Sequence, residues 1–190
     1  MVELAIPDPS VVLLVGAAGA GKSTFAARHF PPGAVLSSDA LREAIAGDAA
    51  DQAATRPAFV ALHRALDRRL ALGRLVVVDA TNLTATARRT IRRIAARRGI
   101  PVVAIALDLP EAFIRERNAA RLGRQVPDAV VTRHLRLLAT AMAREELAAE
   151  GYVRLVHLRD PDDLDRLTVR LVPSPNVATV DGPGPAGDGP

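Results

Sequence analysis

The eight residues at positions 16–23, GAAGAGKS, constrain the fold of this chain more than any other segment. A continuous run of β-branched and leucine residues, 11–15, precedes them, and residues 22–29 have helical character. Such a run is typical of a strand buried on both faces of a parallel sheet. The segment matches the pattern G-x-x-x-x-G-K-[ST] in full and lies between a strand and a helix, as the pattern requires. It therefore predicts a phosphate-binding P-loop.

The residue types of this loop explain its chemistry. Glycines let the backbone curl so that successive N–H groups point at phosphate oxygens, and the following helix adds its positive end. Lys22 is expected to bridge the β- and γ-phosphates of ATP, the phosphate donor, and the hydroxyl of Ser23 to hold the cofactor Mg²⁺. The predicted nucleotide-binding residues are Gly16, Ala17, Ala18, Gly19, Ala20, Gly21, Lys22, Ser23 and Thr24.

Lys22 is also the only lysine of the chain, since the other 24 of its 25 basic residues are arginine. The formal net charge of +4 and the sequence pI of about 10.8 suit anionic partners such as nucleotides or nucleic acid. A coding bias toward arginine and alanine explains the surplus equally well. Such a bias does not explain the surviving lysine. A compact ammonium acts in a P-loop as a point charge between phosphates, a role that suits the planar guanidinium poorly.

Apolar runs alternate with helical patterns along most of the chain. Strands are predicted at 11–15, 34–37, 75–78, 101–107 and 153–158, and helices at 22–29, 41–46, 56–72, 85–98, 128–149 and 162–167, with another beginning at Pro110. This alternation predicts an α/β fold of the P-loop NTPase kind, a five-stranded parallel sheet flanked by helices. Residues 1–172 are expected to form one kinase domain, and the Pro- and Gly-rich residues 173–190 a disordered tail or linker.

Asp39 follows the second predicted strand, and Asp79 follows the third. Ligands of open α/β sheets bind at the carboxyl ends of the strands, so both carboxylates are expected at the site. Asp39 can accept the proton of an attacking hydroxyl, and Arg42, one helical turn further, can steady an anionic acceptor. Asp39 could instead cap the following helix. Asp79 is expected on the magnesium side of the site with Ser23, or it orients its own loop.

Arg117, Arg121 and Arg124 are spaced i, i+4 and i+7. On one helix they would share a face, where like charges repel unless a polyanion lies opposite. This spacing suits a lid that closes over the triphosphate and neutralises charge that develops during transfer. Gly123 predicts that the helix ends there, with Arg124 on a loop. The frequency of arginine in the chain would produce the same spacing by chance.

The histidines of the chain, and the arginines of the helix predicted over 85–98, are weaker candidates for functional residues. The histidines have no metal-ligand spacing and are expected to be surface or structural residues. An arginine-rich helix is expected to present a basic face, either solvated or in contact with nucleic acid. The histidines are His29, His63, His134 and His157, and the arginines of that helix are Arg88, Arg89, Arg92, Arg93, Arg97 and Arg98.

Two absences in the sequence narrow the class of protein. No cysteine is present, which excludes a disulfide framework and a thiol nucleophile. No apolar segment near the N-terminus reaches the length of a bilayer span, so a soluble cytoplasmic protein without a membrane partner is expected.

These motifs together resemble the kinase module of bacterial polynucleotide kinase-phosphatase, an RNA-repair enzyme, and more broadly the 5′-hydroxyl polynucleotide kinases. The similarity extends over residues 11–172, which correspond to the kinase module of the multidomain relatives and not to their phosphatase and ligase-like domains. The chain is therefore expected to be either a stand-alone kinase or a part of a multidomain protein. The motifs that carry it, in chain order, are the P-loop, Ser38-Asp39-x-x-Arg42, DQAAT at 51–55, VDATN at 78–82, Arg117 and Arg121 with Arg124, and the turn Glu150-Gly151-Tyr152.

The resemblance implies transfer of the γ-phosphate of ATP to a 5′-hydroxyl end of RNA or DNA. It implies Asp39 as the general base and Arg42 with Gln52 as contacts to the acceptor. The catalytic residues would be Lys22, Asp39, Arg117, Arg121 and Arg124.

Two alternatives stay open at this point. The first is a kinase for a small alcohol such as a nucleoside, a sugar or an antibiotic, and the second is a regulatory module that binds ATP. Arg42 favours an acceptor that already carries phosphate. Asp39 argues against the regulatory module, which has no need of a base on the acceptor side.

Overall fold

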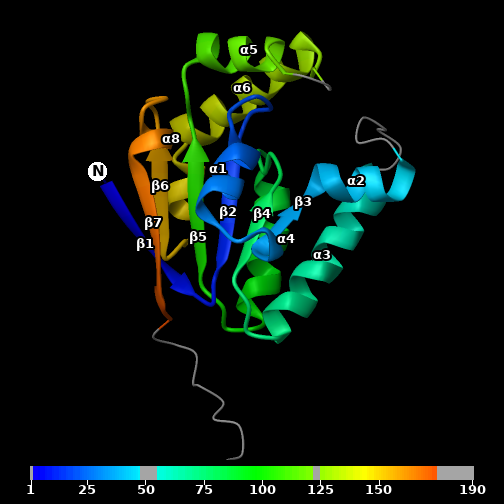
Figure 1. Cartoon of the computed structure of the whole chain (residues 1–190), viewed down its shortest axis with the longest axis vertical. Helices are drawn as coiled ribbons and strands as arrows, with labels where there is room; N and C mark the ends of the chain where they lie inside the picture. The colour runs from blue at the N-terminus through cyan, green and yellow to red at the C-terminus, as the bar shows by residue number, and fades with distance from the viewer. Residues whose placement is uncertain (1, 48–54, 122–124, 175–190) are drawn as a thin grey trace, which may run out of the picture.

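A five-stranded parallel sheet forms the centre of the molecule (Figure 1). The computed structural model describes residues 2–47, 55–121 and 125–174. The strands of this sheet follow the order β3-β4-β2-β5-β6, which confirms the predicted α/β class. Their bounds are β2 Val11–Gly16, β3 Val35–Ser37, β4 Val76–Asp79, β5 Val102–Leu107 and β6 Arg154–Leu158.

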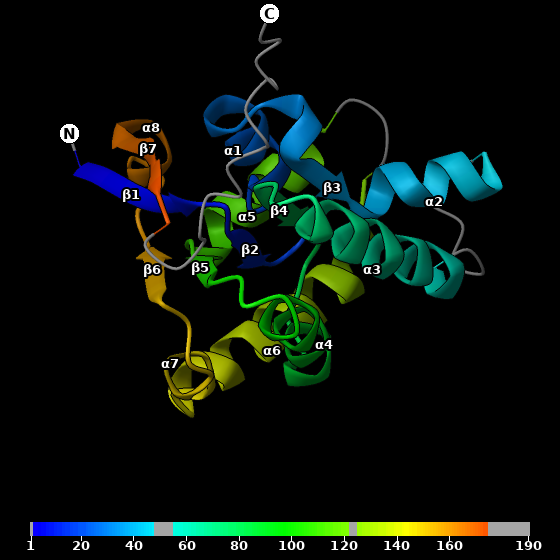
Figure 2. The same ribbon diagram turned by 90° about the horizontal axis from the view of Figure 1, so that it is seen from below.

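Helices cover both faces of this sheet (Figure 2). Their bounds are α1 Lys22–His29, α2 Ser38–Ala46, α3 Thr55–Ala71, α4 Ala85–Ala96, α5 Glu111–Ala119, α6 Asp128–Ala143, α7 Glu146–Ala149 and α8 Asp163–Arg166, with a 3₁₀ turn at Pro32–Ala34. Alternate residues of β2 belong to different apolar clusters: Val12 packs with Phe25 of α1, whereas Leu13 packs with Leu62 of α3 and Ile91 of α4. Because β2, β4 and β5 are buried along their whole length, they read in the sequence as continuous apolar runs.

A second, two-stranded parallel sheet joins the two ends of the described chain, and the sequence patterns did not predict it. Strand β1 (Val2–Asp8) pairs in register with β7 (Leu167–Pro173), and β7 thus runs one residue past the predicted domain boundary at 172. Leu4, Ile6 and Leu167 point into the same apolar cluster as Val12. Among residues 3–8 and 167–173 only Leu4, Ile6 and Leu167 are buried, so neither strand has the continuous apolar run that predicted β2, β4 and β5. Residues 175–190, most of the predicted tail, lie outside the described part of the chain.

Among the predicted helices, those over 128–149 and 162–167 differ most from the observed ones. The helix predicted over 128–149 is broken, because Glu145 adopts a positive φ of 52° between α6 and α7. The helix predicted over 162–167 is a single turn, and Leu167 already belongs to β7. The parallel register of β3 and β4 places Ser37 opposite Asp79, so the ends of these strands meet beside the P-loop.

Candidate active site

The P-loop requires glycine at Gly19 and Gly21, because both have φ near +90°. A Cβ atom at Gly19 would lie 2.8 Å from the carbonyl oxygen of Ile114. At the start of the loop, the N–H of Gly16 donates to the carbonyl oxygen of Thr81 at 3.0 Å and ties the loop to the chain that leaves β4. The loop is therefore held on two sides, by α5 and by the segment after β4.

Lys22 lies nearly buried at the first position of α1. Its Nζ donates to the carbonyl oxygens of Ala17 at 2.7 Å and Gly16 at 3.1 Å, inside its own loop. Burial lowers the pKa of Lys22 to about 8; the carboxylate of Asp79 opposes this shift and Arg121 adds to it. Bound phosphate would place negative charge next to the Lys22 ammonium and would compete with the two carbonyl oxygens for it.

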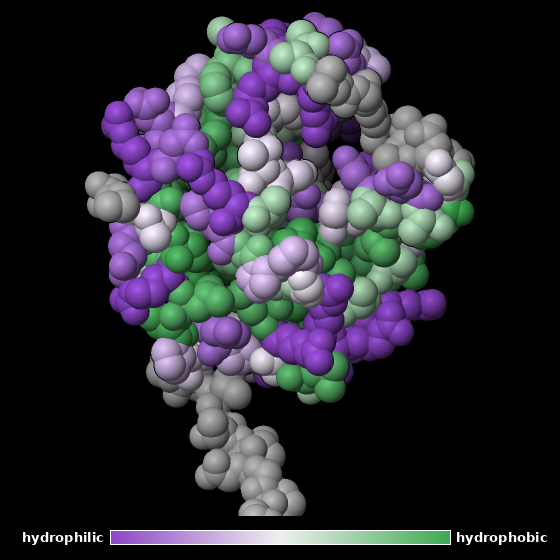
Figure 3. All heavy atoms as spheres, viewed as in Figure 1, coloured by the Kyte–Doolittle hydropathy of each residue, from purple (hydrophilic) through white to green (hydrophobic). Residues whose placement is uncertain are grey.

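A cavity of about 380 Å³ opens beside the P-loop, and Figure 3 shows hydrophilic residues on α5 and α2, the helices that flank it. Ala17 and Ala20 face the apolar core instead, and Gly16 is buried at the end of β2. Gln52 and Arg124 lie outside the described residues. The predicted site residues that line the cavity are Ala18, Gly19, Gly21, Lys22, Ser23, Thr24, Asp39, Arg42, Asp79, Arg117 and Arg121.

Asp39 and Arg42 form an ion pair in the first turn of α2 and both line the cavity. The helix begins three residues earlier than predicted, because the side chain of Ser37 accepts a hydrogen bond from the N–H of Ala40 and acts as the N-cap. Asp39 is therefore free of the capping role that the sequence left open. The side chain of Arg42 is 13% exposed and that of Asp39 52% exposed, so the carboxylate is open to solvent.

Asp79 ends β4 as a buried carboxylate beside Ser23 in the same cavity. Among the described residues, no group of three or more His, Cys, Asp or Glu side chains could hold a metal ion. Mg²⁺ does not need such a cage, because it keeps several waters and takes one or two protein oxygens together with phosphate oxygens. Ser23 and Asp79 thus fit a magnesium ion that arrives with a nucleotide.

The predicted arginine lid is only partly a helix face. Arg117 lies on α5, its Nη2 donates to the Oγ1 of Thr24 at 3.5 Å, and its guanidinium lies over the ring of Phe113 at 5.5 Å. Helix α5 ends at Ala119, so Arg121 lies beyond it and the prediction of one shared helix face does not hold. The side chain of Asn118 exchanges two hydrogen bonds with the backbone of Val126, at 2.8 and 3.1 Å, and so connects the end of α5 to the residues before α6.

His134 of α6 is a site residue that the sequence did not reveal. Its Nδ1 accepts a hydrogen bond of 3.3 Å from the backbone N–H of Ala18, inside the P-loop, and its ring lines the cavity. Burial lowers its pKa, and the positive charges of Lys22 and Arg133 lower it further. Because 116 residues separate His134 from Ala18, no local spacing could have predicted the contact.

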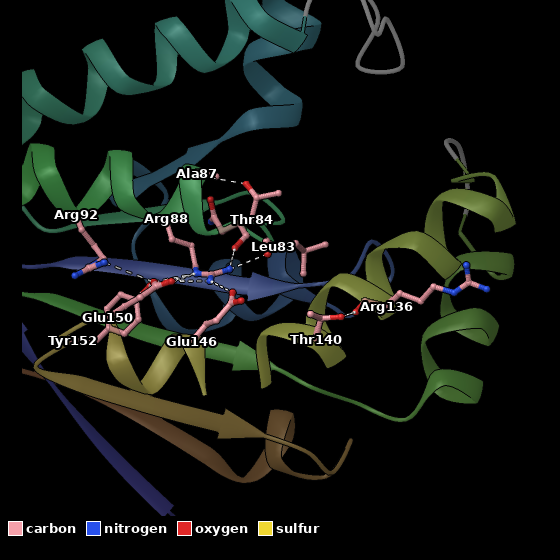
Figure 4. A network of polar contacts seen from close by, with 11 residues as sticks. Leu83, Thr84, Ala87, Arg88, Arg92, Arg136, Thr140, Glu146, Glu150 and Tyr152 are labelled. Carbon is pink, nitrogen blue, oxygen red and sulfur yellow. Dashed lines mark hydrogen bonds and ion pairs between the residues drawn. The ribbon is translucent and has the colours of Figure 1, made fainter. Parts of the chain in front are cut away.

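Arg88, expected on a basic helix face, is fully buried. It lies between Leu83, in the loop after β4, and Glu150 (Figure 4). Its Nη1 donates to the carbonyl oxygens of Leu83 at 2.8 Å and Asn82 at 3.3 Å, and its Nε and Nη2 hold the carboxylate of Glu150. The predicted basic face is accordingly smaller than the sequence indicates. A buried guanidinium is stable only where its charge and its N–H donors have partners. The sequence of α4 does not distinguish Arg88 from the other arginines of this helix.

The other end of this network is the turn before β6. The hydroxyl of Tyr152 donates to Glu150 at 2.5 Å, and Arg92 lies over the Tyr152 ring at 5.5 Å. Asn82, which has a positive φ of 49°, donates from its side chain to the carbonyl oxygen of Leu14 at 2.7 Å. The loop after β4 is thus fastened both to β2 and, through Arg88, to the turn at Glu150.

Residues 11–146 match the family model described as an AAA domain, which is more than half of the chain. The chain belongs to this AAA domain family. Its fold is the P-loop NTPase kinase fold, as the five-stranded parallel sheet and the loop geometry require. Among the described residues, the helices of this AAA domain protein include none that is long and apolar enough to cross a bilayer. No curated protein matches the chain in sequence.

Solved structures with the same fold include several kinases. A chain of the Pnkp1/Rnl/Hen1 RNA repair complex has 21% identity and a TM-score of 0.63; the match covers 73% of this AAA domain chain and 47% of the other, so the chain spans about half the length of that relative. A gluconokinase from Sinorhizobium meliloti 1021 has 23% identity and a TM-score of 0.52, with 84% and 87% covered. The Mycobacterium tuberculosis APS kinase CysC has 20% identity and a TM-score of 0.50, with 83% and 91% covered.

Proposed function

We propose that this chain is an ATP-dependent kinase that transfers the γ-phosphate to the 5′-hydroxyl end of RNA or DNA. The observation that carries the proposal is the Asp39–Arg42 pair, which lines the same cavity as Lys22 of the P-loop. A base and an anion-binding arginine on the acceptor side distinguish a phosphotransferase from a P-loop protein that only hydrolyses or senses ATP. The likeness to a chain of the RNA repair complex agrees with this proposal and concerns the fold alone.

The donor side of the proposal rests on the P-loop and α5. Lys22 binds the β- and γ-phosphates, and Arg117 and Arg121 neutralise charge on the transferring group. Ser23 and Asp79 would hold Mg²⁺, which would supply further charge neutralisation. A second hollow of about 290 Å³ opens between α1, α5 and α8 and shares Gly21, Thr24 and Arg117 with the main cavity. It offers space for the nucleoside part of ATP on the far side of Arg117.

The acceptor side involves a competition for Arg42. While the guanidinium holds the Asp39 carboxylate, that carboxylate is a poor proton acceptor. A phosphate of the polynucleotide next to its 5′-end competes for Arg42, since guanidinium groups bind phosphate and carboxylate alike. Asp39 is then available to take the proton of the 5′-hydroxyl.

The bond changes balance in one step. The O–H proton passes to Asp39 as the 5′-oxygen forms a bond to the γ-phosphorus. The bond from that phosphorus to the β,γ-bridging oxygen breaks, and ADP leaves with the electron pair. Little covalent chemistry falls to the protein, so positioning and charge neutralisation account for most of the rate.

A kinase for a small alcohol is a second candidate, favoured by the size of the cavity. About 380 Å³ lies within the range of sites for small ligands. Thr55 and Phe59 at the start of α3 also line it and could contact a compact acceptor. The gluconokinase and the APS kinase share this fold, which hosts many acceptors.

Transfer of label from γ-labelled ATP with Mg²⁺ separates the candidates. The acceptors are 5′-hydroxyl oligonucleotides of RNA and DNA, nucleoside 3′-phosphates, and a panel of nucleosides, sugars and sugar acids. We expect labelled 5′-ends on oligonucleotides. Label on a small alcohol with none on any oligonucleotide would show that the second candidate is right.

The Asp39→Asn variant tests the role of the base. We expect it to lower the transfer rate by roughly two to four orders of magnitude, the usual contribution of a positioned general base. Affinity for ATP should change little. The Asp67→Asn variant is a matched control, because Asp67 is also a partly exposed carboxylate paired with an arginine, Arg98, outside the cavity. A near-normal rate for Asp39→Asn would refute the assignment of the base.

A further inference from the structure

We infer that His134 is a donor-phosphate-binding residue that exchanges roles when ATP binds. Its ring accepts the Ala18 N–H in the arrangement described here and, once protonated, donates to phosphate. The inference rests on the proposed function only in taking the P-loop as the site of the triphosphate. Its starting point is the hydrogen bond from the N–H of Ala18 to the Nδ1 of His134, 3.3 Å long.

The N–H of Ala18 is the donor for which phosphate and imidazole would compete. Ala18 is the third residue of the P-loop, one of the positions whose N–H groups point at phosphate oxygens. In the structure this N–H points into the cavity at the imidazole of His134. If a phosphate oxygen accepts from this N–H, as expected in a P-loop, ligand and imidazole compete for one donor.

The hydrogen bond also fixes the protonation state of the His134 ring. A nitrogen that accepts a hydrogen bond carries no proton, so His134 is neutral while it accepts from Ala18, with its proton on Nε2. Burial and the charges of Lys22 and Arg133 lower its pKa and favour this neutral form. A phosphate oxygen at the N–H of Ala18 would face the lone pair of Nδ1 and repel it. Protonation turns this repulsion into a charge-assisted hydrogen bond.

The charges that line the cavity also affect the protonation of His134. The groups that face the cavity with His134 are Lys22 from α1, Asp39 and Arg42 from α2, Asp79 from β4, Arg117 from α5 and Arg121 after it. Cations outnumber carboxylates in this set, which disfavours a protonated histidine while the site is empty. A bound triphosphate reverses the sign of the local charge and raises the pKa of His134.

Binding of ATP is therefore coupled to proton uptake at His134. Because the pKa is higher in the complex, the extra affinity is fully present at pH values below the pKa of the free site. It is lost as the pH rises through the pKa of the complex. Each unit of pKa increase corresponds to about a tenfold gain in affinity across this window.

Isothermal calorimetry with the β,γ-imido analogue of ATP and Mg²⁺ tests the inference. Titrations in buffers of different ionisation enthalpy give the number of protons taken up. We expect uptake by the unaltered chain near neutral pH that is absent in His134→Gln, whose amide oxygen can still accept from Ala18. We also expect the affinity of the unaltered chain, relative to this variant, to rise about tenfold from pH 8 to pH 6.

The His157→Gln variant is the matched control, because His157 is a half-buried histidine of β6 that does not line the cavity, and its pKa is also lowered by burial. It should behave as the unaltered chain does. Equal proton uptake by His134→Gln and the unaltered chain would overturn the inference and leave the proposed kinase untouched. So would an affinity loss in His134→Gln that is the same at every pH. If the unaltered chain fails to bind the analogue, both proposals fall.

Imidazole NMR signals of the unaltered chain provide a second readout that needs no variant of His134. The pKa of His134 should rise when the analogue is added, while that of His157 stays constant. A pKa of His134 that does not rise would refute the coupling even if the His134→Gln protein did not fold.

Discussion

Gly19 is the residue at which the P-loop tolerates a side chain least. Its φ is +89°, and a Cβ atom would lie 2.8 Å from a backbone oxygen of α5. We expect Gly19→Ala to lower the free energy of unfolding by about 1–3 kcal/mol, through strain in the left-handed region and displacement of Ile114. Urea unfolding measures the loss.

Gly33 provides the control for this substitution. A Cβ atom there meets nothing within 4 Å, and its φ is not positive. The Gly33→Ala variant should remain within about 0.5 kcal/mol of the unaltered chain. Equal losses at the two positions would show that crowding at Gly19 is not the cause.

Lys22 provides a second test at the scale of one residue. Its ammonium sits nearly buried between two carbonyl oxygens of its own loop, where a guanidinium would have to displace backbone. We expect Lys22→Arg to keep the charge and still reduce phosphate transfer by roughly two orders of magnitude or more, the effect of losing one well-placed donor. The reverse change at an exposed site, Arg89→Lys, should leave transfer unchanged in the same assay.

At the scale of elements, Arg88 connects α4 to the loop after β4 and to the turn before β6. Its removal in Arg88→Met leaves the carboxylate of Glu150 buried with weaker partners. We expect a loss of about 3–5 kcal/mol in the free energy of unfolding, as for one partner of a buried ion pair. The Arg98→Met variant breaks an exposed pair with Asp67, and its loss of stability should be far smaller than that of Arg88→Met.

A double variant separates charge from shape in this network. If the loss in Arg88→Met comes from an uncompensated charge, adding Glu150→Gln should restore part of it, because the amide is neutral. Additive losses would instead indicate that the two side chains act through packing. Urea unfolding of the four proteins of this cycle gives the answer.

The sequence predicted correctly those elements that are determined by residues close to them along the chain. The buried strands β2, β4 and β5 read as apolar runs because both of their faces are covered, and the P-loop has a local pattern. The break at Glu145 lies in a stretch of good helix formers, where only tertiary packing sets the turn. Arg88 and His134 have distant partners, so no spacing revealed that the first is buried and the second meets the P-loop.

At the scale of the whole molecule, the β1–β7 sheet joins the ends of the described chain to the main core. Ile6 of β1 is fully buried in the cluster that contains Val12 of the central strand. We expect Ile6→Ala to lower the stability of the whole domain by about 2–5 kcal/mol in one cooperative transition. Circular dichroism and the fluorescence of Tyr152 should report the same midpoint.

Leu171 of β7 supplies the control, because its side chain is 39% exposed. The Leu171→Ala variant should cost far less than Ile6→Ala. Separate midpoints for the two probes in Ile6→Ala would mean that the β1–β7 sheet melts on its own and that the shared core does not couple it to the P-loop domain.

The pairing of Asp39 with Arg42 has a consequence for water. Any kinase with ATP in place is exposed to a wasteful side reaction, in which a water molecule takes the phosphate that the acceptor should receive. In the proposed kinase, a carboxylate held by its own arginine would activate water poorly and would protect the nucleotide until an acceptor binds. We expect Arg42→Gln to release more inorganic phosphate per phosphate delivered to an acceptor, a ratio that a hydrolysis assay with and without oligonucleotide measures.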